Sequence, residues 1–244
     1  MTTGTKALIG VLGGMGPLAT IDFMTKVRAV TPAQRDQEHV PLLVHCVPQI
    51  PERVSAILTG GDDPFESLLA GARTLESAGV QAIVIACNTA HHWHARLSAE
   101  VDVPILHIVD AVHDLLVQRQ QPIRRIALMG TQATRVSRMY DRLVGDAAGE
   151  LVLPDAATQS EIDQSIRCVK SGELALARIH AAKAADQLLE QQHADLLLQA
   201  CTELPIAMQE YAHADLCIDA THALAQACVR FSLGFFTTNE GVTS

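Results

Sequence analysis

Three features that would point to a membrane, a metal or a nucleic acid are missing from this sequence of 244 residues. No uninterrupted apolar run approaches the roughly 20 residues of a membrane-spanning helix. The cysteines show no close C-x-x-C spacing, so neither a zinc site nor a disulfide framework is indicated. Basic charge is scarce, and a net charge of -9 argues against a nucleic-acid-binding surface. We therefore expect a small-molecule ligand, and an acidic one would need cations placed locally.

Signals for export are also missing. The first residues, Met-Thr-Thr-Gly-Thr-Lys, lack the charged start and long apolar region of a signal peptide, which predicts a cytoplasmic protein with free thiols. Most of these thiols should be small buried hydrophobic groups, and this interpretation applies to Cys46, Cys168, Cys217 and Cys228. A hydrophobic content of 48% excludes disorder and suffices for a large core, in one domain or in two small ones.

Two stretches of the chain each carry a cysteine at the end of an apolar run. Residues 82–93 read AIVIACNTAHHW, and residues 196–205 read LLLQACTELP. A run of Ile, Val or Leu of this length predicts a strand buried on both faces. Ligands of open α/β sheets bind at the carboxyl ends of parallel strands. The sequence therefore predicts that Cys87 and Cys201 lie on two sides of one site.

Strands and helices alternate along the chain. Expected strands are residues 6–12, 40–47, 82–87, 105–109, 125–129, 150–153, 196–201 and 216–218. The main expected helices are residues 18–30, 64–77, 90–99, 111–118, a helix that ends at 143, 161–169, 173–192 and 220–231. Alternation of this kind predicts an α/β fold with parallel sheets.

The order of these elements contains a repeat. A turn after a strand, a cysteine strand and a strand ending in Asp occur twice, at Gly14, Cys87 and Asp110 and again at Thr131, Cys201 and Asp219. The repeat predicts two similar parallel-sheet lobes, related by pseudo-two-fold symmetry, with the active site in the cleft between them. We expect residues 1–110 to form the first lobe, completed by 214–236, and residues 111–213 to form the second. Residues 237–244 would be a tail.

A glycine-rich turn follows the first expected strand. Its glycines could bring backbone N–H groups close to an anion. The spacing G-x-x-G-G-x-G-P is not the G-x-G-x-x-G fingerprint, and the second strand does not end in an acidic residue, so a dinucleotide site is disfavoured. Beyond the second strand, a loop with two prolines presents Arg53. This residue is either a solvated surface charge or a two-point clamp for a carboxylate.

A pair of thiols suits a reaction at a carbon stereocentre. One thiolate removes the α-proton, and the other thiol returns a proton to the opposite face. The ordinary thiol pKa can fall at a helix N-terminus, and both cysteines precede an expected helix. Asn88, Thr89 and Thr202 would donate to a substrate carboxylate, and Glu203 could accept from the substrate ammonium or tune Cys201. Each of these could equally be a cap or turn residue.

Three histidines follow the first cysteine and raise the question of a metal. His91, His92 and His94 would lie on one short helix, where neighbouring side chains diverge and cannot all face one ion. The sequence therefore predicts no metal site.

Several motifs together resemble the cofactor-independent aspartate/glutamate racemase superfamily. They are Gly13-Gly14-Met15-Gly16-Pro17, Ile50-Pro51-Glu52-Arg53, Ala86-Cys87-Asn88-Thr89-Ala90, Lys170-Ser171-Gly172 and Cys201-Thr202-Glu203-Leu204-Pro205. The glutamate racemase branch typically carries His after the second Cys-Thr pair. Glu203 stands at this position, which favours the aspartate racemase branch.

The resemblance implies a fold, an activity and a set of site residues. It implies two α/β lobes, usually in a homodimer, and racemisation without pyridoxal or any other cofactor. Cys87 and Cys201 would be the acid/base groups, and Arg53 and Lys170 would hold a side-chain carboxylate. The expected pocket lining is Met15, Asn88, Thr89, Thr131 and Thr202.

The expected substrate is aspartate, with glutamate as a second candidate. Two alternatives stay open. One is a broad-specificity or neutral amino-acid racemase on the same fold, and the other is a non-catalytic dicarboxylate-binding module.

Overall fold

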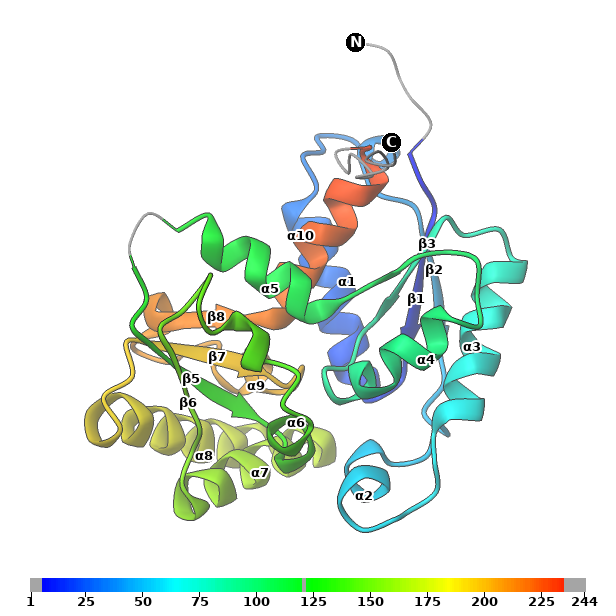
Figure 1. Ribbon diagram of the computed structural model, residues 1–244. Helices are drawn as coiled ribbons and strands as arrows, with labels where there is room; N and C mark the ends of the chain where they lie inside the picture. Colours follow the sequence, from blue (N-terminus) through cyan, green and yellow to red (C-terminus); the bar gives the residue numbers. More distant parts are fainter. Residues whose placement is uncertain (1–5, 120–121, 235–244) are drawn as a thin grey trace, which may run out of the picture.

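Two four-stranded parallel sheets form the centre of the computed structural model, which describes residues 6–119 and 122–234 (Figure 1). The strand order is β2-β1-β3-β4 in one sheet and β6-β5-β7-β8 in the other. Both orders follow the same pattern, with the first strand of each half inside the sheet. This match confirms the α/β fold with two similar parallel-sheet lobes. The expected tail, residues 237–244, lies outside the described residues.

The first sheet and the helices around it come from the N-terminal half of the chain. In order, the elements are β1 (Ile9–Gly13), α1 (Pro17–Val30), β2 (Leu42–Cys46), α2 (Arg53–Leu58), α3 (Phe65–Ser77), β3 (Ala82–Ile85), α4 (His94–Ser98), β4 (Ile105–Leu106) and α5 (Ile108–Val117). Short 3₁₀ turns lie at Asp36–Glu38 and Thr89–Trp93.

The second half repeats this alternation. Its elements are β5 (Arg125–Gly130), α6 (Gln132–Ser137), β6 (Glu150–Val152), α7 (Ala156–Ser171), α8 (Leu174–Asp186), β7 (Leu196–Ala200), α9 (Leu204–Ala207), β8 (Cys217–Asp219) and α10 (Ala220–Ser232). Two 3₁₀ turns, Asp141–Leu143 and Ala214–Leu216, and a π-helical turn, Gln187–Gln191, complete it.

The strands that carry the predicted site are buried on both faces. Every residue of β1, β3 and β7 is buried, as the continuous apolar runs predict. In the register, Leu12 pairs with Ile85, and Gly130 pairs with Ala200. The carboxyl ends of the central strands therefore lie side by side in each sheet, and the segments that follow them meet at the same edge.

Some expected boundaries are wrong, and each has a local cause. The strand expected at 105–109 ends at Leu106, because His107 caps α5 by accepting from the backbone N–H of Val109 at 3.1 Å. The helix expected to end at 143 stops at Ser137, because Arg138 adopts a left-handed backbone with φ of 56°. The helix expected at 161–169 starts earlier, at Ala156, where Asp155 caps it.

The third pair of the sequence repeat is also wrong. Asp219 ends β8 and caps α10, whereas Asp110 lies within α5. His107, which follows β4 and caps α5, is the structural counterpart of Asp219. The repeat is thus correct for the cysteine strands β3 and β7. In the neighbouring strands β4 and β8, the residue equivalent to Asp219 is His107, three residues before the expected Asp110.

The C-terminal segment is shared between the lobes. Strand β8 pairs with β7, so residues 217–219 belong to the second sheet and not, as expected for 214–236, to the first lobe. Helix α10 packs against α1 and α5. The remainder of the predicted division stays a prediction.

One apolar core extends through both lobes. It contains Ile9 and Phe23 from the first half of the chain, Ile126 and Leu198 from the second, and Leu224 of α10. Two further clusters lie on the outer faces, one under α3 and α4 and one under α7 and α8. Figure 1 shows α1, α5 and α10 between the two sheets, where they cover the shared core. Within residues 6–119 and 122–234, no helix is both long and apolar enough to cross a bilayer.

Gly14→Ala is expected to destabilise the fold by about 2–5 kcal/mol, because it combines a left-handed backbone with overpacking. Gly14 has φ of 96°, and a Cβ there would lie 2.5 Å from the backbone of Val47. Gly60→Ala is the matched control: its φ is 69°, nothing lies within 4 Å, and about 1–2 kcal/mol is expected. Urea unfolding of both variants measures the difference. Equal losses would show that the contact with Val47 is unimportant.

Candidate active site

The two cysteines occupy equivalent places in the two lobes. Cys87 lies two residues beyond β3, and Cys201 directly follows β7. Both side chains are buried, with 6% and 5% exposed. Each lies at the carboxyl edge of its sheet, beside the turn that follows the central strand of that sheet. This is the placement that the apolar runs predicted.

Cys201 is held as a thiol by its neighbour Glu203. The thiol donates to Oε2 of Glu203 at 3.0 Å, and the Thr202 hydroxyl donates to the same oxygen at 3.2 Å. Burial and the negative charge of Glu203 raise the pKa of Cys201 well above its usual range, although Lys170 opposes them. Although Cys201 precedes a helix, α9 is a single turn, and the carboxylate contacts the sulfur directly.

Lys170 interacts electrostatically with both cysteines. It lies in the last turn of α7, which ends where Gly172 adopts the left-handed region. Burial by itself would lower the pKa of Lys170, but the negative charges of Glu203, Cys201 and Cys87 outweigh burial and raise it. One ammonium group thus lies within electrostatic range of both cysteines, which come from different lobes.

Arg53 is buried at the start of α2, with 8% of its surface exposed. Its Nη1 donates to the carbonyls of Ile50 at 3.1 Å and Pro51 at 2.9 Å, and Nη2 donates to the carbonyl of Met15 at 3.3 Å. Its buried Nε has no partner within the described chain. This arrangement excludes a solvated surface charge and leaves the Nε edge for a two-point contact with a carboxylate.

A cavity of about 630 Å³ brings residues of both lobes together. Met15 and Arg53 line it from the first lobe, and Lys170 and Glu203 line it from the second. The other predicted site residues are buried beyond its wall, with at most 6% exposed: Cys87, Asn88, Thr89, Thr131, Cys201 and Thr202. Cys201 lies directly behind the wall, because its thiol contacts Glu203.

Polar contacts between the lobes surround Asn88 and Thr89. The Thr89 hydroxyl lies 3.0 Å from that of Thr131 and 3.2 Å from that of Thr134. Thr131 also caps α6 by accepting from the backbone N–H of Thr134. Tyr140 donates to Oδ1 of Asn88. Sequence reasoning missed Thr134 and Tyr140, and the only signal was that Tyr140 is one of two tyrosines in the chain.

Of the three histidines after Cys87, His91 and His94 stack with ring centroids 5.9 Å apart, and His92 packs beside Trp93. His91 is buried, with Nε2 3.3 Å from the carbonyl of Ile85, whereas His92 is exposed. His94 turns to the carbonyl of Ile105 at 2.8 Å. Burial and the neighbouring histidines lower the pKa of His91 well below its usual range. Among residues 6–119 and 122–234, no three His, Cys, Asp or Glu side chains converge so that they could hold a metal ion.

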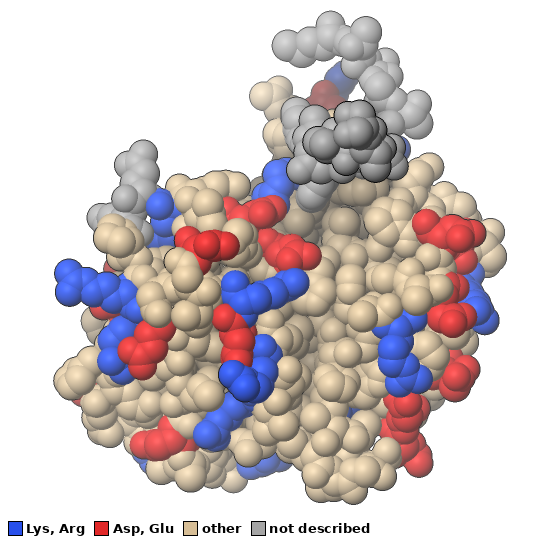
Figure 2. All heavy atoms as spheres, in the orientation of Figure 1, with Lys and Arg blue, Asp and Glu red and all other residues tan. Residues whose placement is uncertain are grey.

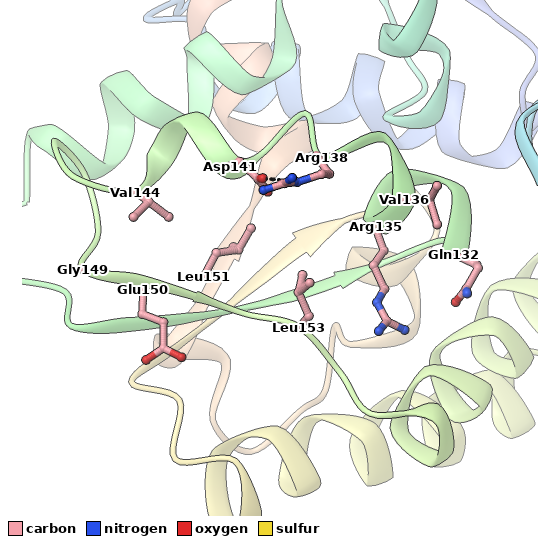
Figure 3. A pocket seen from close by; sticks show the side chains of 10 residues that line it. All are labelled: Gln132, Arg135, Val136, Arg138, Asp141, Val144, Gly149, Glu150, Leu151 and Leu153. Atoms are coloured by element: carbon pink, nitrogen blue, oxygen red, sulfur yellow. Dashed lines mark hydrogen bonds and ion pairs between the residues drawn. The ribbon is translucent and has the colours of Figure 1, made fainter.

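A second cavity, of about 780 Å³, lies at the edge strand β6 of the second lobe (Figure 3). Its lining includes the apolar side chains of Val136, Val144 and Leu153, together with Arg138 and Asp141. These two charged residues neutralise each other in an ion pair at 2.6 Å. None of the predicted site residues lines this cavity, whereas Met15, Arg53, Lys170 and Glu203 line the cavity between the lobes.

Comparison with known proteins agrees with the fold. The sequence matches the Asp/Glu/Hydantoin racemase family over residues 12–228. Picrophilus torridus aspartate racemase is similar in structure, with a TM-score of 0.83 and 31% identity, covering 93% of this chain and 94% of that chain. An aspartate racemase homologue from Pyrococcus horikoshii OT3 shares the fold, with a TM-score of 0.72 and 22% identity over 94% of this chain and 100% of that one.

A curated relative extends the comparison along nearly the whole sequence. The broad specificity amino-acid racemase RacX of Bacillus subtilis (strain 168) is 27% identical over 235 residues, which cover 93% of this chain and 99% of the relative. These matches indicate an amino-acid racemase, and the chain belongs to the Asp/Glu/Hydantoin racemase family.

Proposed function

We propose that the protein racemises an acidic amino acid without a cofactor, by a two-base mechanism in which Cys87 and Cys201 act on opposite faces of Cα. Aspartate is the first candidate substrate, and glutamate is the second. The observation that carries the proposal is the cavity between the lobes, which Arg53, Lys170 and Glu203 line together and where Glu203 contacts the Cys201 thiol at 3.0 Å. Two cations and a carboxylate beside a thiol suit a single small acidic amino acid. The likeness to Picrophilus torridus aspartate racemase supports the acidic substrate.

The charges at the cavity complement those of aspartate. Arg53 and Lys170 supply two positive charges, and Glu203 supplies a negative charge; the Glu52 carboxylate also lines the cavity, but it caps α2. The substrate offers two carboxylates and one ammonium. The Nε edge of Arg53 and the ammonium of Lys170 would hold the side-chain carboxylate. Oε1 of Glu203, which is buried and has no partner within the described chain, would accept from the substrate ammonium.

The cations for this substrate lie inside the cleft. On the face seen in Figure 2, charged side chains lie over the second lobe and along the outer edge of the first, and the surface between them is mostly uncharged. Recognition of an acidic substrate would thus depend on Arg53, which is buried, and on Lys170, which lines the cavity with an exposed side chain. The contact of Arg53 with a carboxylate would be the stronger one, because less water reaches it.

The α-carboxylate would bind near the first cysteine. Nδ2 of Asn88 is buried and has no partner in the described residues, so it is a donor available to a ligand. Thr89 and Thr202 place hydroxyls on the two cysteine segments, and Met15 closes the cavity with an apolar side chain. This arrangement leaves Cα between the two thiols.

The proposed reaction has two proton transfers. A thiolate removes the α-proton and becomes a thiol, and the electron pair of the C–H bond stays on the substrate as a planar carbanion. The opposite thiol then gives its proton to the other face and becomes the thiolate. Because the Cys201 thiol donates to Glu203, we assign Cys201 as the acid and Cys87 as the base for one of the two enantiomers. For the other enantiomer the roles are exchanged.

The proposal is tested by giving the purified protein L-Asp, D-Asp, L-Glu and D-Glu without added cofactor and following both enantiomers by chiral chromatography. Interconversion of at least one acidic pair is expected. Equal or faster turnover of neutral amino acids would favour the broad-specificity alternative, which the likeness to RacX supports. Dicarboxylate binding in calorimetry, with no solvent deuterium entering Cα, would instead identify a non-catalytic binding module.

Glu203→Gln is expected to shift the pH dependence of catalysis to lower pH. Because the pKa of Cys201 is raised, its thiolate forms only as the pH increases beyond the usual thiol range. The rate for the enantiomer that needs Cys201 as the base should therefore rise with pH. Removing the negative charge of Glu203 lowers this pKa, so the rise should begin at a lower pH. The measurement is the pH profile of kcat/KM for each enantiomer.

Glu52→Gln is the control for this shift. Glu52 also lines the cavity, but its carboxylate caps α2 by accepting from the backbone N–H of Ser55 at 2.6 Å. Its removal should leave the position of the pH profile unchanged. If both variants shift the profile equally, the direct contact between Glu203 and Cys201 is not the cause.

The family resemblance also supports a cytoplasmic homodimer. Analytical ultracentrifugation of the full chain would test the oligomeric state, and a monomer at all concentrations would contradict it.

A further inference from the structure

Tyr140 is a buried polar residue that the proposed mechanism does not use. It follows α6 in the second lobe, and only 1% of its surface is exposed. Its hydroxyl donates to Oδ1 of Asn88, which belongs to the first lobe and directly follows Cys87. A hydroxyl buried to this extent needs a hydrogen-bond partner. Within the described residues, Asn88 is the partner that the Tyr140 hydroxyl has.

This hydrogen bond decides how the Asn88 amide points. An amide offers one acceptor oxygen and one donor nitrogen, on opposite sides of its terminal carbon. With Oδ1 accepting from Tyr140, Nδ2 must face away from Tyr140. It is buried and makes no hydrogen bond in the described part of the chain. A buried donor without a partner costs free energy unless a ligand satisfies it.

The surroundings keep Tyr140 a donor. Burial, followed by the charge of Cys201, raises the pKa of Tyr140 above its ordinary value, so the hydroxyl is a donor at neutral pH. The charge of Cys201 affects the pKa of Tyr140, and Asn88, which accepts from Tyr140, directly follows Cys87 in the sequence. The hydroxyl therefore lies near both cysteine segments.

We propose that Tyr140 is a positioning residue for catalysis: it reaches across from the second lobe and fixes the Asn88 amide, so that Nδ2 donates to the substrate α-carboxylate. This inference rests on the proposed racemisation. Loss of the α-proton moves negative charge into the α-carboxylate, so a donor fixed there stabilises the transition state more than the bound substrate. The effect should therefore appear mainly in kcat.

Tyr140→Phe removes the hydroxyl and keeps the ring in the core. Loss of a hydrogen bond that orients a donor to a charged group should lower kcat/KM about 10- to 100-fold, mainly through kcat. Tyr211→Phe is the matched control. Tyr211, the other tyrosine of the chain, donates to Asp186 at 2.6 Å on an exposed surface, and its variant should retain parental kinetics.

A double-mutant cycle separates positioning from general support of the fold. If Tyr140 acts through Asn88, Tyr140→Phe should add no further loss of kcat in an Asn88→Ala background. Losses that multiply in the double variant would overturn the inference. An unchanged kcat in the Tyr140→Phe variant would also overturn the inference.

One further variant keeps the test valid if Tyr140→Phe does not fold. Asn88→Asp retains an acceptor for Tyr140 but has no amide donor, so kcat should fall by at least the same factor; circular dichroism at the assay temperature checks that the variant is folded. Parental activity in this variant would refute a donor role for Nδ2. Failure of the parental protein to racemise any of the four acidic amino acids would instead refute the proposed function itself.

Discussion

Replacing Cys87 or Cys201 by serine is expected to lower racemisation by about 10²- to 10⁴-fold, which is the contribution of a positioned acid or base. A serine hydroxyl is far less acidic than a thiol, so it can neither serve as the base nor readily give up its proton. Each single variant loses one face of the reaction, and racemisation needs both. Chiral chromatography with aspartate measures the loss.

Exchange with solvent distinguishes the two cysteines. A variant that keeps one thiol should still exchange the α-proton of one enantiomer for deuterium in D₂O without inverting the centre. Cys46→Ser is the control, because Cys46 at the end of β2 is not part of the cavity lining. The expectation of a buried thiol is wrong for Cys46, which is exposed, whereas Cys228 is buried and Cys168 and Cys217 are partly buried. If Cys87→Ser and Cys201→Ser both racemise at the parental rate, the two-base mechanism is wrong.

Arg53→Lys is expected to raise the KM for aspartate about 10- to 100-fold, as for the loss of a charge-assisted hydrogen bond. The free Nε edge of Arg53 suits a two-point contact with a carboxylate, and an ammonium cannot reproduce that geometry. Lysine would also leave the carbonyls of Ile50 and Pro51 with fewer donors. The measurement is the KM for aspartate beside that for alanine.

The comparison with alanine tests what Arg53 recognises. Any turnover of alanine, which lacks a side-chain carboxylate, should change little. Arg73→Lys is the control, because Arg73 forms an exposed ion pair with Glu100 at 2.9 Å on the surface of the first lobe. An equal rise of KM for both amino acids would show that Arg53 supports the cavity wall and does not bind the side-chain carboxylate.

Local patterns predicted the strands that carry the cysteines because those strands are buried on both faces. The runs before Cys87 and Cys201 are apolar without alternation, which is typical of central parallel strands. The same pattern was too short to place the end of β4, where a capping histidine, and not an apolar residue, determines the boundary.

Other site features depend on contacts between distant segments. The sequence alone allows Arg53 to be either a solvated surface charge or a binding residue of the site. In the structure its guanidinium is buried and donates to the glycine-rich turn at Met15. The pKa direction of Cys201 could not be predicted, because it depends on how the Glu203 side chain turns back to the sulfur. Tyr140 was missed for the same reason, since its partner lies in the other lobe.

The apolar core shared by the two sheets has a consequence for folding. Side chains of β1, β5, β7 and α10 fill one continuous interior, so neither half of the chain can by itself bury the apolar face that it contributes to this shared core. Heating should therefore give one cooperative transition in calorimetry, with the calorimetric and van't Hoff enthalpies in agreement. Either half expressed separately should aggregate, and the cleft should change shape by small adjustments at its mouth, without separation of the lobes.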